Sequence, residues 1–154
     1  MNQRSPLTRV LALIGTILVL LPIVFMLLTS AIGTARSGSF RMDYLIPGEL
    51  FPLVVLGGGL LFMAARLAHS RRRRLIGWSF GVAVASLILA QGLAIVTGLA
   101  SGETPAEGLP WIAVLALLAI YDLTVLVLGV AGALLVRDLF AGETGGVPPA
   151  APLA

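Results

Sequence analysis

Four consecutive arginines, at positions 71–74, lie between two long apolar stretches at residues 45–65 and 75–100. A helix needs about 20 predominantly apolar residues to cross the hydrocarbon core of a bilayer, so each stretch is long enough to span it. Arginines beside a spanning segment stay on the cytoplasmic side of the membrane. The arginine run therefore predicts an integral membrane protein and also predicts its orientation.

The composition agrees with that class. Hydrophobic residues make up 58% of the 154 positions and charged residues 11%, against roughly 25% charged residues in an ordinary soluble domain. The net charge of +3 does not indicate nucleic acid, because the arginines lie at the edges of apolar stretches and have no nucleic-acid motif around them. The use of arginine without lysine is a compositional hint of a prokaryotic source.

No residue set in the sequence suits a metal or another cofactor. The chain contains no cysteine, which excludes disulfides, thiolate metal sites and cysteine nucleophiles. Its one histidine, His69, cannot form a metal site alone. Phosphate-loop, zinc and nucleophile-elbow motifs are also absent, so we expect neither a cofactor nor an enzyme.

Four apolar stretches predict an all-α protein, an antiparallel bundle of four transmembrane helices at about 10–32, 47–69, 75–100 and 111–136. Pro22 should kink the first helix, since proline removes a backbone hydrogen bond. This first stretch also ends in a small-x-small pattern typical of signal-peptide cleavage, at residues 33–35, but it is longer than a signal core of about 7–15 residues. We expect it to be retained. For the second helix both Pro47 and Pro52 suit a first turn, and the start at Pro47 is preferred because it gives a longer span.

The arginines are divided unequally between the two sides of such a bundle. Eight lie on the side of the termini and two, Arg36 and Arg41, on the other. The positive-inside rule then places both termini in the cytoplasm of a cell membrane and the loops at 34–44 and 101–110 outside. Residues 1–140 form the transmembrane domain, and the Gly-, Pro- and Ala-rich segment 141–154 is predicted to be a disordered cytoplasmic tail.

Small residues recur at helical spacing in two of the predicted helices. Close packing of helices in lipid depends on such residues, because there is no hydrophobic driving force that brings apolar helices together in lipid. We therefore expect helix contacts at Gly77, Gly81 and Ala85, with a second row through Ser86 and Ala90, and at Gly129 and Ala133. Asp122 is seven residues before Gly129 and should share its face, pointing at a neighbouring helix.

Asp122 is the strongest candidate for a functional residue. It lies about 11 residues inside the fourth helix, or roughly 16 Å from the outer surface, where a charge costs at least about 2.5 kcal/mol. Gln91 lies at a similar depth and is its expected hydrogen-bond partner. With Glu49 and Tyr121, these residues form a candidate intramembrane polar site. Alternatively, a protonated Asp122 holds helices together, and Glu49 stabilises the start of the second helix.

The arginine run has two compatible interpretations. It fixes topology, and it can bind anionic lipid headgroups through Arg71, Arg72, Arg73 and Arg74.

Two functions follow from these features. The first is a small non-catalytic accessory or assembly subunit whose helices pack with other membrane chains, in a homo- or hetero-oligomer. The alternative is an oligomeric carrier or channel that binds a proton or cation through Asp122, Gln91 and Glu49. A lipid-modifying enzyme is third, because acid–base chemistry by carboxyl groups alone needs a pocket that the sequence does not reveal.

Overall fold

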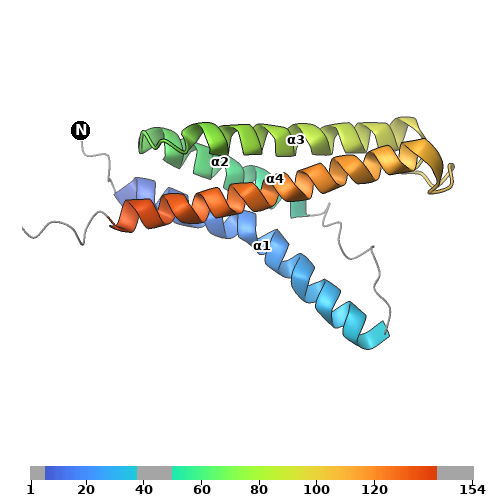
Figure 1. The fold of residues 1–154 in the computed structure, drawn as a ribbon, viewed down its shortest axis with the longest axis horizontal. Helices are drawn as coiled ribbons and strands as arrows, with labels where there is room; N and C mark the ends of the chain where they lie inside the picture. Colours follow the sequence, from blue (N-terminus) through green and yellow to red (C-terminus); the bar gives the residue numbers. More distant parts are fainter. Residues whose placement is uncertain (1–5, 38–49, 142–154) are drawn as a thin grey trace, which may run out of the picture.

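The computed structural model describes residues 6–37 and 50–141, and the regular secondary structure in these ranges is entirely helical. The helices are α1 (Pro6–Ser37), α2 (Phe51–Leu67), α3 (Arg73–Val96) and α4 (Gly108–Ala141). Successive helices run in opposite directions (Figure 1). The start of α1, the α2–α3 turn and the end of α4 meet at one end of the molecule, called here the arginine end. The opposite end, with the α3–α4 loop, is the loop end.

Three of these helices, α1, α3 and α4, are long and apolar enough to cross a membrane. The fourth, α2, has 17 residues, which at 1.5 Å per residue gives a length of about 26 Å. The expectation of an all-helical chain with several potential spans is thus confirmed. The short α2 occupies only part of the length that α3 and α4 cover together (Figure 1).

The helix bounds differ from the predicted ones most clearly at α2. This helix begins at Phe51, with Leu50 as its N-cap and Pro52 in the first turn, so the preferred start at Pro47 is wrong. The reason is steric, since a proline inside a helix lacks the amide hydrogen and its ring collides with the carbonyl four residues earlier. Whereas α2 is shorter than predicted, α1 and α4 each extend beyond both predicted ends. The predicted disordered tail lies, apart from Ala141, outside the described residues.

A tight turn joins α2 to α3. The amide of His69 donates to the Arg66 carbonyl (3.1 Å) and that of Ser70 to the Ala65 carbonyl (3.1 Å), the paired bonds of a Schellman motif. His69 takes the left-handed conformation that this motif requires, with φ of 47°. The turn therefore sends α3 back alongside α2 within a few residues and places the arginines together.

Two helix backbones approach each other closely where α1 crosses α2. A Cβ atom on Gly15 would lie 2.8 Å from the Gly57 carbonyl oxygen, and one on Gly57 would lie 2.9 Å from the Gly15 carbonyl oxygen. Real Cβ atoms do not approach other atoms so closely, so the two backbones can meet only because both residues are glycine. This crossing is the small-residue contact that helix pairing in lipid relies on.

Neighbouring glycines bring the remaining helices against this pair. Gly58, the next residue of α2, faces Phe80 of α3 and Leu128 of α4. On α4, a Cβ atom at Gly132 would lie 2.8 Å from Thr16 Oγ1 and 2.9 Å from Leu61 Cδ1. Gly57 and Gly58 thus present α2 to α1 on one side and to α3 and α4 on the other.

The core lies toward the arginine end, where all four helices meet. Its largest fully buried side chains are Val19, Val54, Leu61, Ile76, Leu128 and Leu135. Toward the loop end α3 and α4 continue as a two-helix hairpin (Figure 1). The second half of α1 diverges from the other helices beyond Pro22, the proline inside this helix. The bundle is therefore closed at one end and open at the other.

We expect Gly57→Ala to destabilise the protein by about 1–3 kcal/mol, because the added methyl group meets a backbone oxygen that cannot move without separating α1 from α2. The measurement is reversible unfolding in mixed detergent micelles, followed by circular dichroism. Gly59→Ala is the matched control, since nothing lies within 4 Å of its Cβ position.

The control should be neutral or stabilising by up to about 1 kcal/mol, through the higher helix propensity of alanine. Equal loss of stability in the two variants would show that the substitutions act on the helix itself and not on the α1–α2 crossing.

Candidate functional site

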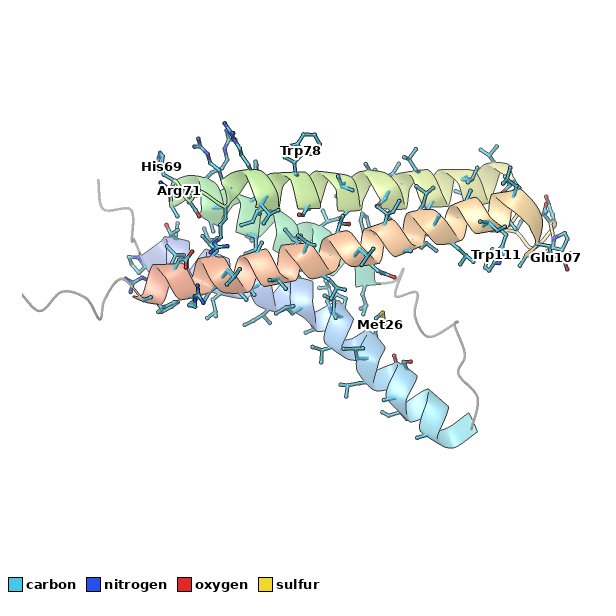
Figure 2. The ribbon with its side chains drawn as sticks, viewed as in Figure 1. Met26, His69, Arg71, Trp78, Glu107 and Trp111 are labelled. Carbon is cyan, nitrogen blue, oxygen red and sulfur yellow. The ribbon has the colours of Figure 1, made fainter. Side chains whose placement is uncertain are left out.

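Asp122 lies near the middle of α4 and faces α1. Its half-buried side chain lines a small cavity of about 40 Å³ with Pro22, Ile23 and Met26 of α1. The α1 side of this region is seen in Figure 2, where Met26 is labelled close to the point at which α1 diverges. The cavity is about large enough for one water molecule. Asp122 was predicted to point at a neighbouring helix, and the helix across this cavity is α1.

Tyr121 lines the same cavity and is 4% exposed. Across from it, Pro22 has no amide hydrogen, so one carbonyl of the preceding turn of α1 lacks its usual helical donor. A carboxyl group, a phenol and a helix irregularity are thereby gathered at one place. Two of the four residues of the candidate polar site are therefore together.

The other two members are not brought to this cavity in the described structure. Gln91 is exposed on α3, and no hydrogen bond joins it to Asp122, although both lie within the described part of the chain. The expected Gln91–Asp122 pair is absent because Asp122 lies on the face of α4 that meets α1. Glu49 lies outside the described residues.

The small residues of α4 take different positions. Gly129 is buried against α1, and a Cβ atom there would lie 2.6 Å from Leu20 Cδ2. It faces the same helix as Asp122, as their spacing predicted. Ala133 is exposed, and its neighbour Gly132 makes the close contact instead.

On α3 the two predicted rows behave differently. Ser86 and Ala90, in the second row, are buried. In the first row, only Gly77 approaches another helix, with its Cβ position 3.0 Å from Phe62 Cε2 of α2. Gly81 has nothing within 4 Å of its Cβ position, and Ala85 is exposed. These two residues therefore do not pack against a helix in the described structure.

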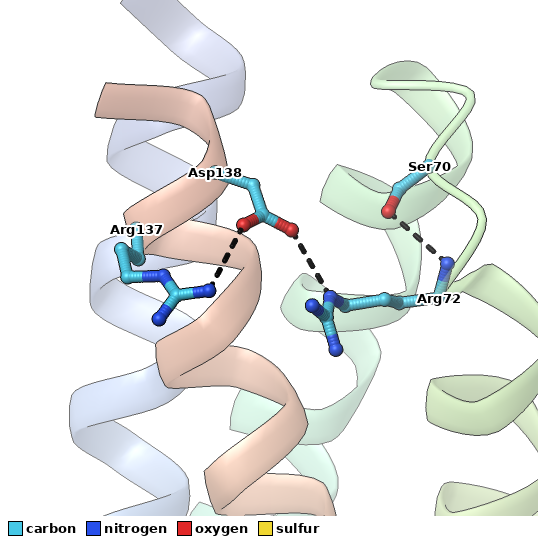
Figure 3. Close-up of polar contacts among 4 residues, drawn as sticks. All are labelled: Ser70, Arg72, Arg137 and Asp138. Atoms are coloured by element: carbon cyan, nitrogen blue, oxygen red, sulfur yellow. Dashed lines mark hydrogen bonds and ion pairs between the residues drawn. The ribbon is translucent and has the colours of Figure 1, made fainter. Parts of the chain in front are cut away.

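One arginine of the run forms an ion pair that the sequence analysis missed. Arg72 Nε donates to Asp138 Oδ2 of α4 at 3.0 Å, and Arg137 Nη2 lies 3.9 Å from the other carboxylate oxygen (Figure 3). The backbone amide of Arg72 also donates to Ser70 Oγ at 3.2 Å. Asp138 thus ties the α2–α3 turn to the end of α4. The sequence feature that could have predicted this ion pair is the position of Asp138 beside Arg137, at the end of the last apolar stretch.

The remaining arginines of the run are exposed. Figure 2 shows the α2–α3 turn, with His69 and Arg71 labelled, at the opposite end of the molecule from Trp111 and Glu107. Arg73 and Arg74 lie in the first turn of α3. In the described residues, no ion pair engages either of them.

Among residues 6–37 and 50–141 no group of three or more His, Asp or Glu side chains is placed to hold a metal ion. Comparison with protein families, curated proteins and solved structures found no match to this chain. The function must therefore be argued from the geometry alone.

We expect Asp122→Asn to leave the fold intact, with little change in unfolding midpoint. The carboxamide group of asparagine is about as large as the carboxyl group of aspartate and can still form hydrogen bonds. Purified wild-type and variant chains are reconstituted into vesicles with an internal pH-sensitive dye, and proton flux is measured under an imposed gradient.

We expect vesicles with the wild type and vesicles with Asp122→Asn to show the same proton flux as protein-free vesicles. The control is Asp138→Asn, which removes a carboxylate at the arginine end. A flux present in the wild type and in the control but lost in Asp122→Asn would instead favour the carrier.

Proposed function

We propose that this chain is a non-catalytic accessory subunit that assembles in a cell membrane with the transmembrane helices of another protein. The observation that carries the proposal is the divergence of α1 from its own bundle beyond Pro22 (Figure 1). An apolar helix that leaves its bundle inside a membrane exposes apolar side chains that its own bundle does not cover.

The exposed side chains of this half of α1 point in several directions around the helix. Phe25 is 54% exposed, Leu27 60% and Leu28 57%. The first half of α1, by contrast, contributes Ala12 and Val19, both 0% exposed, to the core. One half of the helix thus belongs to the bundle, and the other half is available to another chain.

The loop end of the α3–α4 hairpin offers a second unpaired apolar surface. Ile95 and Val96 of α3 are 67% and 85% exposed, and Leu109 of α4 is 80% exposed. Because α2 does not reach this region, no other described helix packs on the hairpin there. A partner helix beside the diverging half of α1 would find apolar surface on this hairpin as well.

The carrier remains the alternative function. The cavity that joins Asp122, Tyr121 and the α1 bend favours it, because a membrane-embedded acid is a common proton site. The separation of Gln91 from Asp122 removes one of its expected ligands. The accessory role draws on more of the molecule, so we retain it as the principal proposal.

We also infer that the protein is a multi-pass one with both termini in the cytoplasm. The arginines of the start of α1, the α2–α3 turn and the end of α4 share one end of the molecule, while Glu103 and Glu107 lie in or beside the loop at the other. Basic residues accumulate on the cytoplasmic side of spanning helices, which supports this orientation.

The partner is tested by photo-crosslinking from single cysteines, a clean method here because the chain has no native cysteine. Leu28→Cys, carrying a benzophenone maleimide, should yield one discrete adduct with another membrane protein in native membranes. Leu89→Cys on α3 is the matched control, since Leu89 is 59% exposed and Leu28 57%.

Support requires that the captured protein is identified by mass spectrometry, co-purifies stoichiometrically and falls in abundance when this chain is deleted. Adducts of equal yield from both positions, or adducts with lipid alone, would contradict the proposal. An adduct with the mass of two copies of this chain would replace it with self-association.

The orientation is tested by labelling single cysteines in intact cells with a membrane-impermeant maleimide. Ala106→Cys, in the α3–α4 loop, should react from outside. Arg71→Cys, at the arginine end, should react only after permeabilisation. The reverse pattern would show that the arginine end faces away from the cytoplasm.

A further inference from the structure

A groove of about 750 Å³ runs along the outer side of α2 and α3 at the arginine end. Its floor is the row of small residues on α3, namely Gly77, Gly81 and Ala85. This row covers two helical turns, about 12 Å along the axis. Because Gly81 has nothing within 4 Å of its Cβ position, the floor is open to whatever lies beside the protein.

The walls of the groove are apolar and aromatic. Phe62 of α2 forms one side, in contact range of the Gly77 Cβ position. Trp78 of α3, 76% exposed, borders the groove and points away from the bundle (Figure 2). Tryptophan is favoured at the boundary between hydrocarbon and headgroups. The groove therefore extends from the interfacial region into the apolar part of the membrane.

Three guanidinium groups stand at the mouth of the groove, those of Arg66, Arg73 and Arg74. Arg66 is placed by Phe62, whose ring centre is 5.4 Å from its Cζ atom. No ion pair engages any of the three within the described ranges. Of the four acidic side chains described, only Asp138 lies at this end, and it is bound to Arg72.

The lack of acidic partners destabilises the start of α3 because of the position of Arg73 and Arg74. They occupy the first turn of α3, which contains no acidic residue. The start of a helix carries a partial positive charge, so cations there are destabilising unless an anion lies nearby. Topology alone requires positive charge on this side of the membrane but does not require a groove beneath it. An anionic group at the mouth would satisfy both the helix start and the three arginines.

We propose that this groove binds one anionic phospholipid, with its phosphate on Arg66, Arg73 and Arg74 and an acyl chain along Gly77, Gly81 and Ala85. The charge at the mouth matches the headgroup, and the small residues of the apolar floor leave room for the acyl chain below it. The lipid would thus cover Gly81 and Ala85, on which no described helix packs. This proposal does not depend on the accessory function.

The test uses Trp78 as the reporter. The chain has two tryptophans, so a Trp111→Phe background leaves Trp78 alone. The full chain is reconstituted into dioleoyl phosphatidylcholine vesicles that contain increasing fractions of dibrominated phosphatidylglycerol or dibrominated phosphatidylcholine. Bromine quenches nearby tryptophan fluorescence, so the ratio of the two quenching curves gives the preference for the anionic lipid. We expect a preference of about fivefold or more, the factor for a single arginine near an anionic surface.

Two pairs of variants separate the groove from general surface charge. Gly81→Leu adds a side chain to the floor at an open Cβ position and should abolish the preference, whereas Gly92→Leu, on the same helix with an equally open Cβ position, should retain it. Likewise, Arg73→Gln with Arg74→Gln should abolish it, while Arg71→Gln, outside the groove, should not. Because the readout is a ratio, any general shielding of Trp78 affects both lipids alike.

Three results would overturn the proposal. Equal quenching by the two lipids would show that the groove does not select an anion. A preference that survives Gly81→Leu would assign it to exposed arginines acting as a charged surface. Protection of Trp78 from both lipids would show that the groove is covered by a helix of a second copy of this chain.

Discussion

The contact between Gly15 and Gly57 determines how closely α1 and α2 can pack, and the rest of the bundle is arranged around that pair. Apolar side chains are as well solvated by lipid tails as by each other, so helices associate in a membrane only where their surfaces fit closely. Here the fit is backbone against backbone. One turn further along α2, Leu61 is fully buried and reaches Gly132 of α4, so the close crossing also sets the distance at which α4 packs.

The number and approximate positions of the helices were predictable from the sequence. A long apolar stretch in a chain with few charges can form few structures other than a membrane-spanning helix. The face of α4 that carries Asp122 and Gly129 was also predictable, since helical periodicity fixes which residues share a side. The identity of the helix opposite that face was not. Small residues indicate that another helix can approach closely, but they do not indicate which helix does so.

The contrast between two glycine groups shows this limit. The regular spacing of Gly77 and Gly81 resembles a packing motif, yet Gly81 faces open space and α4 packs on another side of α3. The adjacent glycines of α2 have no such spacing, yet Gly57 and Gly58 make close contacts with three helices. Similarly, the Asp122 partner was sought on α3 because Gln91 had the right depth. Depth along the membrane can be counted from sequence, whereas rotation of one helix about another depends on packing across the whole bundle.

The cation–π contact between Arg9 and Phe140, with 5.4 Å between the guanidinium carbon and the ring centre, joins the first turn of the first helix to the last turn of the last helix. Contacts so distant in sequence form only after the intervening chain has been made, and they are slow to form because a long loop must close. During synthesis, α1 can pair with α2 as soon as that helix exists, through Gly15 and Gly57. Its α4-facing side, with Thr16 and Leu20, has no partner until α4 has been made. The order of translation therefore leaves one side of the bundled half of α1 without its partner helix until synthesis of the helical region is nearly finished.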